Sequence, residues 1–138
     1  MSPSQRRNYV SVAIGAALSG AATTVQDMIT VEDVRRITST LPRSYEVVVR
    51  DQIKFRVGSI VYVAFSRDET VMGVAFPKEE RAAMVAAEPD KFMLPRESDM
   101  RYNWIHVRLD AIDLEELREL VIDGWRMCVP KKIAAQVN

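Results

Sequence analysis

From residue 28 onward, apolar residues recur at regular spacings that predict helices and strands in turn. Residues 31–41 carry apolar side chains every three to four positions, which predicts an amphipathic helix. Thr30 is a favourable N-cap, and Asp33 three residues later completes the pattern of a capping box. Pro42 is expected to end this helix, because a residue before proline is disfavoured in the helical conformation.

Four short strands are predicted next, separated by turns of only a few residues. Residues 45–50 and 71–76 are rich in β-branched and apolar residues, and residues 60–65 form a mostly apolar strand. In the strand over 53–57, apolar and basic residues alternate, so Lys54 and Arg56 are expected on one face. The short connections favour an antiparallel meander.

Helices surround one further strand in the second half of the chain. In order, the pattern predicts a helix that opens at Pro77 and runs to 87, an irregular connection over 92–101, a strand over 104–109, a helix capped by Asp113 and Glu116, and a short helix over 130–137. Gly124 is expected to break the helix capped by Asp113, just before Trp125. The fold class predicted is therefore α+β, with an antiparallel β-sheet packed with helices.

Length and composition limit the classes of protein that need to be considered. The chain has 138 residues, which fits one domain over 28–138, preceded by an extension. Lys plus Arg and Asp plus Glu are 19 each, so a nucleic-acid ligand would require cations gathered on one face. The single cysteine, Cys128, allows neither an internal disulfide nor a cysteine-based metal site and favours a reducing compartment.

Residues 1–27 differ in character from the rest and are predicted to be a flexible or dispensable extension. Arg6 and Arg7 precede an apolar run and then small residues, which is also the order of parts in a secretory signal peptide. Translation from Met28 is a further alternative. The apolar run is too short to span a bilayer, so we expect no stable membrane insertion. The location expected is cytoplasmic, or outside the cytoplasm if the segment is an export signal.

No familiar catalytic or cofactor motif occurs, so the prediction is a non-enzymatic protein without cofactor or metal. There is one histidine, no glycine-rich phosphate loop and no Gly-x-Ser-x-Gly motif. Cys128 and His106 could in principle form a thiol–imidazole pair, although Cys128 beside Trp125 and Met127 reads better as a small buried hydrophobe. The acidic residues between 110 and 119 are interpreted as solvated groups that favour the helix start.

Two faces carry candidate binding residues. Trp104, His106 and Arg108 alternate along one strand and are expected on one face, either as a grip for a planar or anionic ligand or as a solvated surface. Lys54 and Arg56 would suit a phosphate backbone.

Several segments, taken in order, resemble the MmcQ/YjbR-like family over about 28–132. The segments are VEDVRRITSTLP (31–42), KFRVGSIVYVAF (54–65), FPKEERAAMVAAEP (76–89), WIHVRL (104–109) and the lysine-bearing end over 117–132. The resemblance implies a compact α+β fold and DNA binding through hairpins described as a double wing. The positions that match are Lys54, Arg56, Trp104, Arg108, Lys131 and Lys132. Residues 96–99, Arg-Glu-Ser-Asp, depart from the family pattern.

Three functional hypotheses follow from the sequence. The first is a small binding protein for nucleic acid, in which Lys54 and Arg56 contact phosphates and Trp104 stacks on a base. The second is a protein-interaction module, since the architecture resembles small secretion-chaperone-like folds that hold partner segments. The third is a small-ligand or enzymatic pocket around Trp104, His106 and Arg108.

Overall fold

The structure, a computed structural model, describes residues 29–137; the predicted extension over 1–27 lies outside them. The chain forms, in order, α3 (Val31–Thr38), β1 (Ser44–Val49), β2 (Gln52–Val57), β3 (Ile60–Phe65), β4 (Val71–Ala75), α4 (Lys78–Ala87), β5 (Phe92–Met93), the 3-10 helix η1 (Glu97–Asp99), β6 (Trp104–Arg108), the 3-10 helix η2 (Leu109–Ala111), α5 (Leu114–Arg126) and α6 (Lys131–Ala134). The predicted elements therefore occur in the predicted order.

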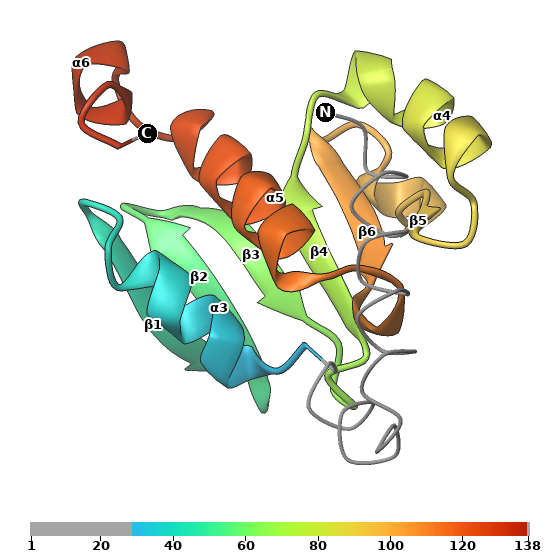
Figure 1. Cartoon of the computed structure of the whole chain (residues 1–138), viewed down its shortest axis with the longest axis horizontal. Helices are drawn as coiled ribbons and strands as arrows, with labels where there is room; N and C mark the ends of the chain where they lie inside the picture. Colours follow the sequence, from blue (N-terminus) through green and yellow to red (C-terminus); the bar gives the residue numbers. More distant parts are fainter. Residues whose placement is uncertain (1–28, 138) are drawn as a thin grey trace, which may run out of the picture.

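One six-stranded antiparallel sheet organises the described residues, with the strand order β1-β2-β3-β4-β6-β5. Helices α3 and α5 lie across one face of this sheet, while α4 packs against β5 and β6 (Figure 1). The prediction of an α+β fold with an antiparallel sheet is confirmed.

Turns and a bulge set the register of the first three strands. Arg50 and Asp51 both have positive φ (52° and 68°), as a tight two-residue hairpin turn requires. The register between β2 and β3 shifts between Phe55 and Arg56, so that Arg56 pairs with Val61. The extra residue, Tyr62, is buried. Since Lys54 and Arg56 remain two positions apart on β2, the bulge leaves them on the same face.

Two capping boxes begin the long helices as predicted. The Thr30 side chain accepts from Asp33 N, and the Asp113 side chain accepts from Glu116 N at 2.8 Å. The predicted break at Gly124 is wrong, because α5 continues to Arg126. At this position α5 lies so close to β4 that an added Cβ would be 3.0 Å from Val74 Cγ2. Gly124 therefore permits close packing rather than ending the helix.

The core lies between the sheet and α5. Leu117, Val121 and Trp125 are buried there, and the Trp125 indole N–H donates to Pro42 O at 2.8 Å. Leu114 has the helical spacing of this apolar stripe, but it is 57% exposed. It is the first residue of α5 and lies one turn before Leu117, where the buried stripe begins.

The connection over 92–101 contains structure that the sequence did not reveal. β5 pairs with β6 through Phe92 and Met93, and Phe92 is buried. Two residues are too few to display an alternating pattern, so a strand of this length gives no periodic signal.

Buried charges are the other unpredicted feature of the fold. On α4, Ala82 and Ala86 are exposed, whereas Arg81 is buried. The interpretation of all the acids near α5 as solvated is wrong for Glu116, which is buried and forms an ion pair with the buried Lys91. A buried charge is tolerated because its partner replaces the lost hydration.

Candidate nucleic-acid interface

The face of the sheet opposite α3 and α5 carries a row of residues from four neighbouring strands. Lys54 of β2 pairs with Ala64 of β3, Ala64 with Gly73 of β4, and Gly73 with His106 of β6. Directly paired residues of antiparallel strands point to the same face. Adjacent strands are spaced about 4.8 Å apart, so the row spans about 14 Å from Lys54 to His106.

A groove with a volume of about 1180 Å³ runs over this face. Its lining comes from strands, loops and turns, and none of the lining residues lies within an α-helix. Ala64, Gly73 and Ala75 form a floor of small residues. The half-buried Trp104 indole occupies the space above Gly73, where an added Cβ would lie 2.5 Å from the indole Cζ2 and 2.6 Å from Nε1.

The wall beyond β6 is the loop over 96–103, which is anchored by Arg81 of α4. The buried Arg81 guanidinium donates to the backbone carbonyl of Tyr102 at 2.7 Å, to that of Trp104 at 3.1 Å and to that of Met100. Three hydrogen bonds from one rigid guanidinium fix the loop and the start of β6 relative to α4. The loop over 96–103 and the start of β6, which carries Trp104, are therefore held in place by contacts within the protein.

The charge of the groove is predominantly positive. Its lining contains three cationic side chains, Lys54, Arg67 and Arg96, and one carboxylate, Asp99. Asp99 lies 3.6 Å from Arg96, so an arginine already neutralises it. Within residues 29–137, neither Lys54 nor Arg67 has a hydrogen-bonding or ionic partner for its side chain. These two charges remain available to an anion.

Two further donors on this face have no acceptor in the part of the chain that the structure describes. Arg56, which shares the face with Lys54, has a buried Nε without a hydrogen-bond partner. The Trp104 indole N–H makes no hydrogen bond there, in contrast to that of Trp125. The Arg56 Nε is itself covered by protein atoms, so what this residue offers to an anion on this face is its positive charge.

Burial shifts the pKa values of two groups that line the groove. It lowers the pKa of His106; Asp99 opposes this shift and Arg96 adds to it, so the imidazole is neutral at pH 7. Burial raises the pKa of the Cys128 thiol, whose sulfur donates weakly to Gly124 O. An activated nucleophilic cysteine has a lowered pKa, so this environment does not favour the thiol–imidazole alternative.

Comparison with known proteins identifies the family. The sequence model of the YjbR family matches residues 39–127. The chain belongs to the YjbR family. No functionally curated protein matches the sequence.

The crystal structure of Deinococcus radiodurans protein DR2400, described by the family-model domain DUF419, has a similar fold. It superposes with a TM-score of 0.66 at 22% sequence identity, covering 77% of this chain and 83% of that one. A likeness at this identity supports the fold alone. It agrees with the six-stranded antiparallel sheet and helices described above.

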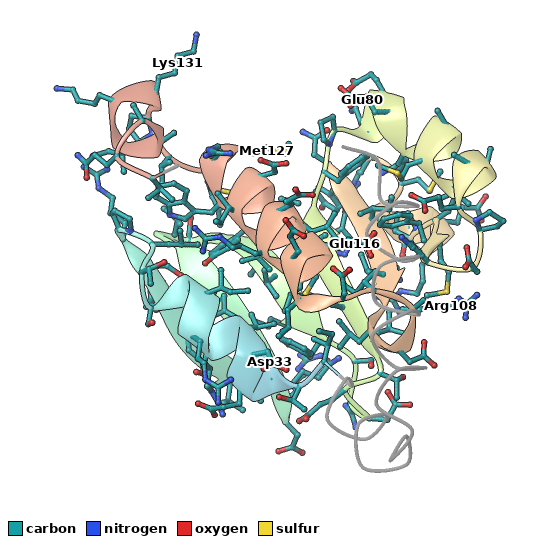
Figure 2. The ribbon with its side chains drawn as sticks, viewed as in Figure 1. Asp33, Glu80, Arg108, Glu116, Met127 and Lys131 are labelled. Atoms are coloured by element: carbon teal, nitrogen blue, oxygen red, sulfur yellow. The ribbon has the colours of Figure 1, made fainter. Side chains whose placement is uncertain are left out.

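The structure separates the six residues that the resemblance to the YjbR family suggested. Lys54 and Trp104 line the groove, Trp104 beside His106, whereas Arg56 shares the strand face of Lys54 but is outside the lining. Arg108 lies on the same strand face but is exposed and outside the lining. Lys131 and Lys132 belong to α6, and Lys131 projects away from the sheet, far from Arg108 (Figure 2). The first three residues thus form a common surface, and the lysines of α6 do not join it.

Other cations near the start of this YjbR-family domain are neutralised on the helix side. Arg35 Nη2 lies 2.8 Å from Glu46 Oε2 and its Nη1 lies 3.2 Å from Glu32. Arg36 Nη1 lies 3.1 Å from Asp33. The hydrogen bond from Arg35 lowers the pKa of Glu46 below its usual range. These residues are therefore not part of the groove.

Several groove residues were missed at the level of sequence. Arg67 was not singled out, and Arg96 was placed only in the irregular connection over 92–101. Gly73 was a usable signal, since a glycine inside an apolar strand often marks a close approach by another group. Arg81 gave no signal, because an arginine on a short amphipathic helix is normally exposed.

The described residues give no indication of a metal centre or a membrane span. They contain no group of three or more His, Cys, Asp or Glu side chains that could hold a metal ion. None of the helices over 29–137 combines the length and the apolar character that crossing a bilayer requires.

Proposed function

We propose that this YjbR-family protein binds nucleic acid, with the phosphate backbone lying along the groove on the open face of the sheet. Lys54, Arg56 and Arg67 would contact phosphates, and they would do so without reading sequence. The protein is proposed to act by binding rather than by catalysis.

One observation carries the proposal: the groove face offers cationic donors without partners and only one carboxylate. Lys54 and Arg67 have no partner within the described residues, and the Arg56 Nε is buried without an acceptor. Asp99, the acidic residue of the lining, already pairs with Arg96. Phosphate oxygens are strong acceptors with negative charge, so they match this set of donors.

A salt titration tests the proposal. Binding of a labelled oligonucleotide of about 20 nucleotides is measured by fluorescence anisotropy, as a single strand and as a duplex. Three or four phosphate contacts predict an affinity loss of roughly 20- to 50-fold between about 50 and 200 mM salt for the single strand. Lys54→Gln should weaken binding. It should also make the slope of log affinity against log salt shallower by the amount that one phosphate contact contributes.

Arg36→Gln is the matched control, since it removes one positive charge from the helix side, where Asp33 already neutralises it. Its affinity and salt slope should equal those of the wild type. Undetectable binding at low salt, or an equal loss for both variants, would contradict the proposal.

A protein partner is the second candidate, and the edge strand β1 favours it. β1 pairs only with β2, and its outer edge has no partner strand in residues 29–137. Val48 on this strand is 65% exposed and Tyr45 is 45% exposed. Such an edge can accept an extended segment of another protein as an added strand. Recovery of one protein in a pull-down, lost in the variant Val48→Pro, which removes an N–H that points to the open edge, would support this alternative.

A further inference from the structure

The groove has an aromatic wall as well as a cationic one, and this combination restricts the form of nucleic acid that fits. Lys54 and Arg56 stand on β2, whereas Trp104 and His106 stand on β6, three strands further across the sheet. Tyr102, 52% exposed, borders the Trp104 side of the groove. Phosphates and bases of one strand could therefore meet different walls of the same groove.

The Trp104 indole is placed where only an unstacked base can reach it. It lies on the floor over Gly73 and is half-buried, with the loop over 96–103 as the adjoining wall. A duplex presents its sugar–phosphate surface outward and keeps its bases stacked inside. Such a convex surface contacts the rims of a groove and leaves the floor empty, whereas a single strand can turn a base inward.

Small residues leave room for that base. Ala64 and Ala75 flank Gly73, so the floor beside the indole is made of small side chains. The indole N–H has no hydrogen-bond partner within the described residues and can donate to a base or to a backbone oxygen. His106, neutral at pH 7 because burial lowers its pKa, adds a second planar group without a repelling charge.

The aromatic wall is also rigid. Arg81 ties the carbonyls of Met100, Tyr102 and Trp104 to α4, so little conformational freedom is lost when a base stacks there. We infer that the groove is a binding site for single-stranded nucleic acid, with one unpaired base against Trp104 and the adjoining phosphates on Lys54 and Arg56. The inference rests on the proposed function and deepens it.

Competition between single strand and duplex tests the inference. The wild-type protein is titrated with an oligothymidine of about 20 nucleotides and with a duplex of equal length at about 50 mM salt. The single strand should bind at least about tenfold more tightly and should quench the tryptophan emission, because stacking on an aromatic ring is worth about tenfold or more per base. Buried Trp125 supplies an internal reference that the ligand does not reach.

Two substitutions at one position separate stacking from folding. Trp104→Leu should lose about tenfold or more in affinity for the single strand and leave duplex affinity unchanged, whereas Trp104→Tyr, which keeps an aromatic face, should retain most of the affinity. Unfolding curves of both variants confirm that each is folded before binding is compared.

The outcomes separate failure of the single-strand inference from failure of the proposed nucleic-acid binding. Duplex binding equal to or tighter than single-strand binding, with no change in emission, would overturn the inference and leave the proposed function standing. Thymidine monophosphate binding as tightly as the oligonucleotide would overturn it in favour of a small-ligand site. The absence of binding to any of these probes would remove both.

Discussion

Lys91→Met tests how the buried charges hold the second half of the domain together. Lys91 is fully buried on the connection between α4 and β5, where its ammonium pairs with Glu116 of α5 and lies 3.1 Å from Glu88. Its backbone carbonyl accepts from Arg108 N at 2.8 Å, so the main chain is fixed independently of the side chain. Methionine fills a similar volume but removes the cation that pairs with Glu116 and contacts Glu88.

The expected loss of stability follows from the burial of Glu116. Its side chain is 5% exposed, so water cannot replace the lost ammonium. Removing one partner of a buried pair costs about 3–5 kcal/mol, a large share of the roughly 5–15 kcal/mol that stabilises a domain. Glu116→Gln retains the capping contact with Asp113 and leaves Lys91 paired with Glu88, so it should cost less, about 1–3 kcal/mol.

Urea unfolding followed by the emission of buried Trp125 provides the measurement. The double variant of Lys91→Met and Glu116→Gln should lose less than the sum of the two single variants, with a coupling of about 1–3 kcal/mol. Arg36→Met, at a surface pair whose arginine is 72% exposed, is the control and should cost about 0.5 kcal/mol or less. A Lys91→Met protein within about 1 kcal/mol of the wild type would refute the reasoning.

Three smaller changes probe the groove itself. Gly73→Ala should lower the free energy of unfolding by about 1–3 kcal/mol, because its Cβ would lie 2.5 Å from the Trp104 indole. The loss should be smaller in a Trp104→Leu background, and urea unfolding in both backgrounds measures the difference. Arg81→Met leaves three backbone carbonyls without their donor, so amide exchange over 96–103 should accelerate at a stability cost of about 1–3 kcal/mol. Because burial lowers the pKa of His106, the imidazole takes up a proton more readily in the unfolded chain than in the folded protein. The stability of the fold should therefore fall as the pH drops below about 6.5. His106→Gln should make this decline in the urea midpoint less steep.

The sequence was sufficient for the elements whose signals are local. The two capping boxes depend on residues three positions apart, and both are found as predicted. Alternation along β2 and β6 correctly placed Lys54 with Arg56 and Trp104 with His106. Such patterns survive folding because they determine which face of an element is buried.

The errors concern contacts between elements that are distant in the sequence. Gly124 was read as a helix break, although its role depends on the approach of β4, about fifty positions earlier. Lys91 and Glu116 are 25 positions apart and satisfy each other only in the folded domain. Neither the hydropathy of a residue nor its immediate neighbours encodes such a pairing, so Glu116 was assigned to the solvated surface.

The balanced net charge illustrates why composition is a poor guide to the charge of an individual surface. Arg35 and Arg36 meet Glu32, Glu46 and Asp33 on the helix side of the sheet, where their charges cancel locally. On the opposite face Lys54 and Arg67 meet no carboxylate within the described residues. A total of zero therefore conceals two unlike faces. Because screening restricts exposed charges to about 10 Å at 0.1 M salt, a ligand in the groove responds to the local set of cations rather than to the sum over the chain.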